Sequence, residues 1–205
     1  MRMNYSFEDM LSQRLRVDFY EQTPEIVAKE LLGKVLVYKK SDDIIAGIIV
    51  ETEAYLHSGD ESSHSFKGLN SRNEAMFMRG GTFYVYLIYG VHHCVNIVTQ
   101  KQGYGSAVLI RAVEPIAGIE VMIANRRNNN IPELCKGPGN LAKSFGFDLS
   151  NNKNSLLSDD LFVCDLNLYT DSAIAIGTRI GITKSAELPL RFYLDGNLYV
   201  SKISK

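Results

Sequence analysis

The sequence predicts a single α+β domain, with a mostly antiparallel mixed sheet, flanking helices and a protruding aromatic β-hairpin. Residues 44–55 indicate a long strand, because Ile48, Val50, Thr52 and Ala54 alternate with Ile49, Glu51, Glu53 and Tyr55. Two runs rich in β-branched and aromatic residues flank Gly90, which is typical of a hairpin. The segments do not follow the βαβ rhythm of a dinucleotide-binding fold, so an antiparallel arrangement is expected.

The first elements are a helix and two strands. Thr23 is the expected N-cap, Pro24 the first helical residue and Gly33 the stop of this helix. Strands are expected over 34–39 and 44–55, joined at 41–43. Along the second strand, period-two geometry places Glu53 and Tyr55 on one face, a carboxylate beside a phenol ring. An isolated pattern of this kind is most often an exposed strand face, so the rest of the chain must decide.

The aromatic hairpin is expected to turn around Gly90, Val91 and His92, where a tight turn needs a permissive backbone. This turn places Tyr86 roughly opposite Asn96. It also places Tyr89 at the tip, where a large aromatic side chain suits a partner such as a base step in nucleic acid. The alternative is that these tyrosines simply pack the sheet.

The remaining elements complete the sheet. A strand is expected near 106–114 and a helix over 116–128. Residues 136–140 precede a short helix through Phe145, whose free N–H groups can bind phosphate, although a plain turn fits as well. Strands are expected near 161–167, 172–182 and 190–201, with a hairpin turn at Asp195-Gly196-Asn197.

Composition fits one domain over residues 1–205, with residues 1–14 as a peripheral N-terminal segment. A chain of 205 residues that is 45% hydrophobic can bury a sizeable core. Cys94, Cys135 and Cys164 are too few and too scattered for a disulfide framework or a zinc site, which suits a reducing cytoplasm. The N-terminus has no apolar signal core and no run approaches transmembrane length. We therefore expect a cytoplasmic protein that needs no membrane.

The charge of the chain is distributed unevenly. The net charge is −1, which does not by itself indicate a nucleic-acid binder. Residues 1–63 hold 7 Lys and Arg against 12 Asp and Glu, whereas residues 64–146 hold 9 against 4. The basic excess therefore coincides with the segment that carries the hairpin. A phosphate-facing surface on an otherwise acidic body has this distribution, and chance can also produce it.

The strand with Glu53 and the aromatic hairpin together resemble the methylpurine (3-methyladenine) DNA glycosylase family. The resemblance runs from about Leu15 to near the C-terminus, in the same order and with near-identical spacing, which makes it more specific than one short motif. Some loops differ in length, and His92 and His93 stand where the mammalian relative has aromatic residues. The matching stretches are Ile49–Tyr55, His64-Ser65, Arg72-Asn73, Met76–Met78, Gly81–Asn96, Leu109–Pro115, Glu133–Leu141 and Leu190–Tyr193.

The resemblance implies which residues carry the chemistry. Glu53 matches the base that activates a water molecule, Arg111 matches the arginine that helps to hold this water, and Ile180 matches a position whose backbone carbonyl touches it. Glu51 shares the face of Glu53 and is open to two interpretations. It is a second catalytic acid, as in glycosidases with two carboxylates, or a structural residue, and the family pattern favours the second.

The resemblance also implies a pocket for an extruded base. Tyr55, His64 and Tyr86 match its walls, and Asn96 matches the residue that crowds the exocyclic amino group of guanine. Tyr89 matches the wedge that intercalates into the DNA. A lone histidine such as His64 is otherwise mostly a surface or hydrogen-bonding residue. The positions expected near the DNA backbone are Arg72, Lys136, Gly137 and Asn140.

These expectations define a monofunctional DNA glycosylase that acts on alkylated purines in duplex DNA. A base such as 3-methyladenine is cationic and leaves readily, so one carboxylate and one water suffice, and aromatic walls favour its charge. Neither a metal nor an organic cofactor is implied, and a monomer is expected. The alternatives are a non-catalytic binder of damaged or unpaired nucleotides and a sugar-processing hydrolase. The water-activating carboxylate argues against the first, and the wedge tyrosine against the second.

Overall fold

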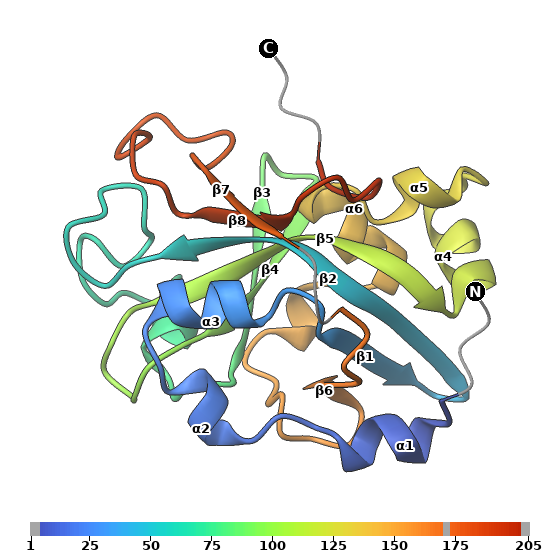
Figure 1. The fold of residues 1–205 in the computed structure, drawn as a ribbon. Helices are drawn as coiled ribbons and strands as arrows, with labels where there is room; N and C mark the ends of the chain where they lie inside the picture. The colour runs from blue at the N-terminus through green and yellow to red at the C-terminus, as the bar shows by residue number, and fades with distance from the viewer. Residues whose placement is uncertain (1–4, 170–172, 202–205) are drawn as a thin grey trace.

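The sheet is organised around one long central strand. The computed structural model describes residues 5–169 and 173–201. It places β2 (Asp43–Tyr55) beside β5 (Ala107–Ala117) on one edge and beside two strands on the other (Figure 1). β1 (Val35–Lys40) pairs with the first half of β2, and β8 (Arg191–Leu194) pairs with its second half. Because β2 is buried over nearly its whole length, both of its faces are covered.

Four further strands extend this sheet. β3 (Phe83–Ile88) pairs with β4 (His92–Val98), which continues onto β5, while β6 (Leu161–Cys164) pairs with β1 and β7 (Ile174–Gly177) pairs with β8. All of these pairs are antiparallel. The predicted α+β class is therefore confirmed, and so are the strands predicted over 34–39 and 44–55.

Helices flank the sheet on more than one side. α3 (Pro24–Glu30) follows Thr23 as predicted and packs on β2, where its Ala28 carbonyl accepts a hydrogen bond from the Thr52 hydroxyl at 2.8 Å. Figure 1 shows α4, α5 and α6 grouped at one end of the sheet, with α1, α2 and α3 on the lower side of the view. The other helical elements are α1 (Phe7–Ser12), α2 (Val17–Tyr20), α4 (Ile119–Arg126), α5 (Ile131–Leu134), α6 (Pro138–Phe145) and the 3-10 helices η1 (Glu74–Phe77) and η2 (Leu149–Asn151).

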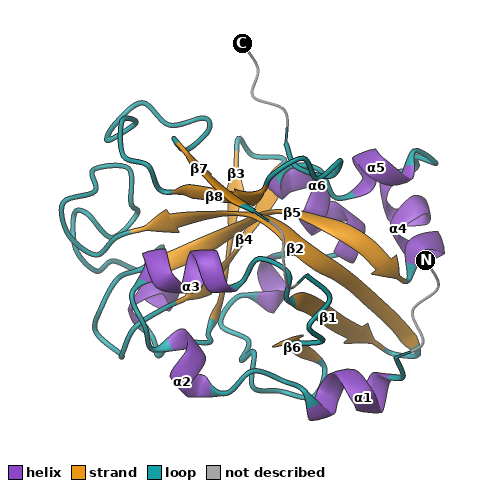
Figure 2. Cartoon of the chain, in the orientation of Figure 1, coloured by secondary structure: helices purple, strands orange, loops and turns teal. Residues whose placement is uncertain are grey.

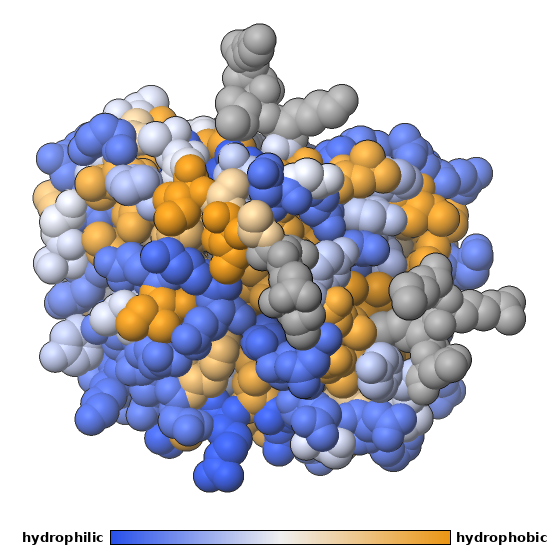
Figure 3. Space-filling view, viewed as in Figure 1, coloured by the Kyte–Doolittle hydropathy of each residue, from blue (hydrophilic) through white to orange (hydrophobic). Residues whose placement is uncertain are grey.

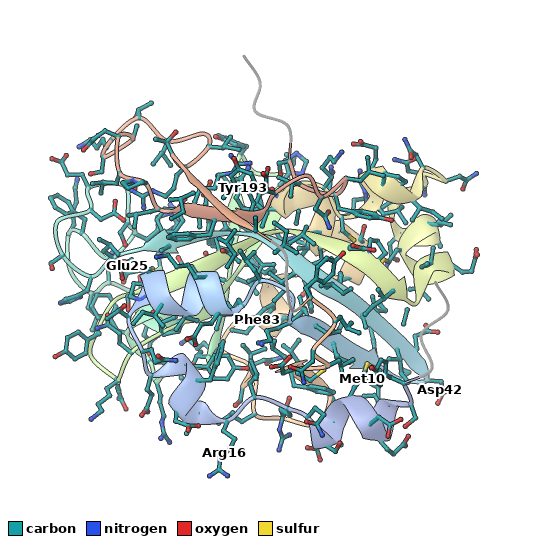
Figure 4. The ribbon with its side chains drawn as sticks, in the orientation of Figure 1. Met10, Arg16, Glu25, Asp42, Phe83 and Tyr193 are labelled. Carbon is teal, nitrogen blue, oxygen red and sulfur yellow. The ribbon has the colours of Figure 1, made fainter. Side chains whose placement is uncertain are left out.

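The core lies between the sheet and these helices (Figure 2). Met10 of α1 is buried, and the ring of Phe7 packs edge-on against Phe162, so α1 is attached to β6. Phe83 is fully buried, whereas Arg16 points away from the body (Figure 4). Polar residues cover much of the face in Figure 3, with apolar residues in small groups among them. Over the described ranges, no helix has the length and apolar character that a membrane span requires.

The turn of the β3–β4 hairpin lies one residue earlier than predicted. Tyr89 and Gly90 both adopt the left-handed backbone conformation, with φ of 54° and 70°. These two residues and Val91 close the turn, so His92 already belongs to β4 and pairs with Ile88. How far the hairpin protrudes from the body stays a prediction.

The earlier turn changes the register of the hairpin. Tyr86 lies opposite Cys94, and Asn96 lies opposite Tyr84, so the predicted pairing of Tyr86 with Asn96 is wrong. The partner of Tyr86 is displaced by two residues. Because side chains alternate with period two, Tyr86 and Asn96 still project from the same face of the sheet.

The boundary between β5 and α4 also differs from the prediction. The strand predicted over 106–114 continues to Ala117, and the helix predicted over 116–128 begins only at Ile119. The extra strand residues pair with the first half of β2, up to Ala46 opposite Ala117. Gly118 then takes a φ of 68°, which ends the strand and starts the helix. A partner strand 13 residues long therefore outweighs the local helical pattern.

The C-terminal strands β6, β7 and β8 are shorter than the predicted 161–167, 172–182 and 190–201, of which residue 172 lies outside the described residues. A turn does occur at Asp195-Gly196-Asn197, but the described chain forms no return strand after it, so the hairpin prediction is wrong. The chain folds back over β2 instead, and the Ser201 N–H donates to Glu51 Oε2 at 2.8 Å. The buried Glu51 carboxylate thus accepts a hydrogen bond from a backbone N–H group that would otherwise have paired with a neighbouring strand.

Candidate active site

A cavity of about 430 Å³ opens beside the hairpin, at the loop that follows β7. Its volume lies in the usual range for small-ligand sites. The structure brings most of the predicted site residues to this cavity, whereas Glu53, Arg72 and Lys136 are not on its surface. The predicted residues on its surface are Tyr55, His64, Tyr86, Tyr89, Asn96, Arg111, Gly137, Asn140 and Ile180.

Glu53 lies directly behind the wall of the cavity and is fully buried. Its Oε1 accepts a hydrogen bond from the Ile180 N–H at 2.8 Å and lies 3.2 Å from Nη1 of Arg111. Its Oε2 accepts a hydrogen bond from the Tyr55 hydroxyl at 3.0 Å. All three partners line the cavity. The carboxylate is therefore separated from a bound ligand only by its own hydrogen-bonding partners.

The surroundings of Glu53 tune its basicity. Burial raises the pKa of the Glu53 carboxyl above the ordinary 4.5, against the opposing effects of Arg111, the Ile180 N–H and the Tyr55 hydroxyl. A carboxylate with a raised pKa is a stronger base than a solvated one. The arrangement thus favours proton transfer to Glu53.

A β-bulge directs Arg111 toward this carboxylate. Glu51 pairs with Ala112 and Thr52 pairs with Ile110, so Arg111 is an extra residue in β5 with no partner in the β2 ladder. Bulges of this kind redirect a side chain and are common beside active sites. Two-residue alternation does not reveal a bulge, so the sequence could not predict this geometry.

Glu51 is fully buried and does not line the cavity. Its Oε1 lies 3.0 Å from Nε of Arg111 and 2.6 Å from Nε of Arg191. Its interpretation as a second catalytic acid is disfavoured, because its carboxylate is bound by two guanidinium groups and does not reach the cavity. Sequence reasoning did not select Arg191. In the described part of the chain, no three His, Cys, Asp or Glu side chains gather as they would around a metal ion.

Three rings form one wall of the cavity. His64 Nδ1 shares a hydrogen bond of 2.9 Å with the Tyr84 hydroxyl, and its ring centre lies 4.6 Å from that of Tyr86. Desolvation of the imidazole, and after it the charge of Arg72, lower the pKa of His64 below the ordinary 6.5, so the neutral imidazole is favoured at pH 7. Tyr84 was not selected from the sequence, although its period-two spacing to Tyr86 was a usable signal.

Asn96 lies at the base of the cavity, where it is 4% exposed. Its Nδ2 donates to the Tyr84 carbonyl at 3.1 Å, across the pair that joins β3 to β4. This bond fixes the orientation of the amide. The Asn96 side chain is thereby held in one orientation at the surface of the cavity.

Tyr89 lies at the turn of the hairpin with 80% of its surface exposed, next to Val91 at 70%. Two large apolar side chains are therefore exposed to solvent at this turn. Tyr89 also reaches the mouth of the cavity. Its position is compatible with the predicted wedge.

The residues predicted near the DNA backbone fall into two groups. Gly137 and Asn140 lie at the cavity around the start of α6, and Asn140 Nδ2 donates to the Lys136 carbonyl at 2.7 Å. The Lys136 ammonium is bound to Glu133 Oε1 at 3.2 Å. Arg72 is exposed in the loop after His64. Their contact with DNA stays a prediction.

A buried ion pair that the sequence did not reveal joins the two loops of the site. Arg179 binds both oxygens of Asp60, at 2.6 Å and 2.8 Å, and donates to the Ala54 carbonyl at 3.0 Å. Neither side chain of the pair is exposed to solvent. Arg179 precedes Ile180, and Asp60 lies in the loop after β2 that also carries His64. Their separation of more than 100 residues gave no local signal.

The fold and this site are those of an enzyme with an aromatic cavity backed by a buried carboxylate. A family model described as methylpurine-DNA glycosylase (MPG) matches residues 18–198. The chain therefore belongs to the methylpurine-DNA glycosylase family and is a DNA glycosylase, a DNA-repair enzyme.

Similar proteins agree with this assignment. The chain is 46% identical over 187 residues to a protein of Methanoculleus marisnigri, covering 90% of this chain and 96% of that one. It is 44% identical over 193 residues to a protein of Legionella pneumophila (93% and 99%) and 43% identical over 188 residues to one of Prosthecochloris aestuarii (91% and 90%). All three carry the name "Putative 3-methyladenine DNA glycosylase".

Proposed function

We propose that this DNA glycosylase rotates alkylated purines out of duplex DNA and hydrolyses their N-glycosidic bond with an activated water, leaving an abasic site. The proposed substrates are 3-methyladenine and 7-methylguanine, with hypoxanthine and ethenoadenine as further candidates. The observation that carries the proposal is the buried Glu53 carboxylate, held behind an aromatic cavity by Tyr55, Arg111 and Ile180. The names of the relatives agree with a methylated adenine as substrate.

The hydrogen bonds of Glu53 indicate which oxygen accepts the proton. Oε1 already binds Arg111 and the Ile180 N–H, whereas Oε2 binds only the Tyr55 hydroxyl. A carboxylate oxygen has two lone-pair sites, so Oε2 keeps one for a water that enters beside Tyr55. As the bond to the purine breaks, the sugar becomes positively charged, and the Glu53 carboxylate stabilises this state while it takes the proton of the attacking water.

The walls of the cavity select the base. Tyr55, Tyr86 and His64 present aromatic surfaces, and a cationic purine over such a face gains on the order of 1–2 kcal/mol. The base must leave the stack to reach the cavity, and Tyr89 at the hairpin turn fills the vacated space. In this proposal the protein acts as a monomer on duplex DNA in the cytoplasm. The three cysteines are free and buried, which suits a reducing compartment.

The test is to incubate the protein with DNA that carries methylated purines and to identify the released bases by mass spectrometry. Release of 3-methyladenine and 7-methylguanine, with alkali-labile abasic sites left in the strand, is the expected result. Tight binding of this DNA without any released base would replace the proposal with a non-catalytic binder of damaged nucleotides. A strand that is cleaved without added alkali would contradict attack by water.

A further inference from the structure

Glu51 and Arg191 form a buried unit directly behind Arg111. Arg191 lies in β8 opposite Glu53, and its guanidinium lies 4.5 Å from the ring centre of Tyr193, which is labelled in Figure 4. It binds Glu51 Oε1 at 2.6 Å and the Ser201 carbonyl at 3.3 Å. Both oxygens of Glu51 are thus held, one by two arginines and the other by the Ser201 N–H.

This unit determines how Arg111 faces Glu53. Arg111 gives its Nε to Glu51 at 3.0 Å and its Nη1 to Glu53 Oε1 at 3.2 Å. An arginine guanidinium with no other partner frequently binds a carboxylate through two parallel hydrogen bonds. Such a bond would cover both oxygens of Glu53, including the Oε2 lone pair needed for water. Because Glu51 occupies the Nε edge, Arg111 reaches Glu53 through one nitrogen only.

We propose that Glu51 is a positioning residue of the excision reaction, which holds Arg111 in the orientation that leaves Glu53 Oε2 open, and that Arg191 holds Glu51 in turn. The proposal rests on the function proposed for Glu53. Neither Glu51 nor Arg191 lines the cavity, so both act through Arg111 and not on the substrate.

The proposal predicts opposite shifts of the Glu53 pKa when Glu51 and Arg191 are changed in turn. The negative charge of Glu51 contributes to the raised pKa of Glu53, and Arg111 opposes it. Glu51→Gln frees Arg111 to turn toward Glu53, which lowers the pKa of Glu53. Arg191→Lys loses the fork that holds Glu51 and the contact with Tyr193. Glu51 then draws Arg111 away from Glu53, and the pKa of Glu53 rises.

The experiment measures single-turnover release of 7-methylguanine from a duplex with one lesion, between about pH 5 and pH 9. For Glu51→Gln we expect a maximal rate at least tenfold lower and an acidic limb displaced to lower pH. For Arg191→Lys we expect a smaller loss of rate and an acidic limb displaced to higher pH. The dissociation constant for lesion DNA should stay within about threefold for both, since neither side chain touches the cavity.

Glu114→Gln is the matched control. Glu114 lies in β5 three residues after Arg111, and its carboxylate binds the Tyr169 hydroxyl at 2.7 Å and Asn197 at 3.3 Å, away from the cavity. This change alters a partly buried carboxylate that also accepts hydrogen bonds, so it should lower the thermal midpoint without moving the acidic limb. A Glu51 that acts on Glu53 through its charge alone would displace the acidic limb in Glu51→Gln but not in Arg191→Lys, which keeps the charges of the unit, and that result would contradict the positioning role.

The outcomes separate this inference from the function on which it rests. A wild-type protein that releases no methylated base contradicts the proposed function itself. A wild-type protein that excises the base, with Glu51→Gln and Arg191→Lys both matching its rate and acidic limb, overturns only the positioning role. If Glu51→Gln does not fold, Arg191→Lys decides, because an unmoved limb in that variant contradicts the arrangement.

Discussion

The guanidinium of Arg179 lies 4.7 Å from the centre of the Tyr55 ring while it binds both oxygens of Asp60. One residue thus touches a wall of the cavity, closes the loop that leads to His64 and precedes the N–H that binds Glu53. We expect the Asp60–Arg179 pair to contribute both to the stability of the fold and to the shape of the site.

The first prediction concerns this pair. Burial alone would raise the pKa of Asp60, but the bonds from Arg179, Ser62 and the Leu56 N–H outweigh it and hold the pKa below 3.8. A lowered pKa stabilises the fold above the unfolded value of about 3.9, and this contribution is lost as the pH falls through the folded value. Asp60→Asn should lower the free energy of unfolding by about 3 kcal/mol at pH 7.

The check is urea denaturation of both proteins across the acidic range. The difference between wild type and Asp60→Asn should begin to shrink near pH 4, where the Asp60 carboxyl of the unfolded chain starts to bind protons, and should be lost as the pH falls through the lower pKa of the folded state. A difference that is constant with pH would show that the carboxylate charge is not what stabilises the pair.

The second prediction concerns Glu53. Glu53→Gln keeps the shape of the side chain but removes the proton acceptor, so lesion DNA should still bind while excision falls by at least about a hundredfold. Gel-shift affinity and single-turnover base release measure the two effects separately. Excision at the wild-type rate would exclude Glu53 as the base.

The third prediction follows from the raised pKa of Glu53. The base acts in its ionised form, so release of a cationic purine should increase with pH until Glu53 is ionised and then level off. The midpoint of this increase should lie above the ordinary 4.5, because the folded pKa is displaced upward. Rates measured on 7-methylguanine test this, and a midpoint at or below 4.5 would contradict the effect of burial.

The fourth prediction concerns discrimination against normal bases. Asn96 is held rigidly by its bond to the Tyr84 carbonyl, so Asn96→Ala removes an obstacle that cannot move aside. We expect this variant to release more unmodified guanine from plain duplex DNA than the parent enzyme does. Equal release by the two proteins would remove Asn96 from the selection of the base.

The fifth prediction concerns the hairpin turn. Tyr89→Ser should weaken extrusion of the base by a few kcal/mol, on the scale of unstacking a base step, while the chemical step stays intact. A 2-aminopurine reporter beside the lesion follows extrusion separately from cleavage. The loss should diminish opposite a gap, where less pairing is broken, and normal extrusion without cleavage would assign Tyr89 to the cavity wall.

Local patterns were sufficient to predict much of the fold. The alternation along 44–55 predicts β2, and the Thr23-Pro24 signal predicts the start of α3, because each depends on a few neighbouring residues. The boundary of β5 and the path of the chain after the turn at 195–197 could not be predicted in this way. They depend on the length of a partner strand and on a carboxylate that binds Ser201.

The features of the site likewise divide into those that depend on neighbouring residues and those that depend on distant ones. Glu53 and Tyr55 share a face by simple periodicity, so their contact could be expected. The pairing of Tyr84 with Asn96 depends on the backbone of Tyr89, and the approach of Arg111 depends on a bulge. Arg179 and Arg191 meet carboxylates more than 100 residues away in the chain, a relation that the sequence of one protein does not contain.

The late position of these partners has a consequence during synthesis. Glu51 and Glu53 are translated early, but apart from the Tyr55 hydroxyl the groups that bind their carboxylates come from much later residues, which are Arg111, Ile180, Arg191 and Ser201. Chains emerge from the N-terminus onward, so a truncated or stalled product contains Glu51 and Glu53 without these later residues that bind their carboxylates. The arrangement that we propose for catalysis by Glu53 is therefore assembled only after residues 111, 180, 191 and 201 have been translated.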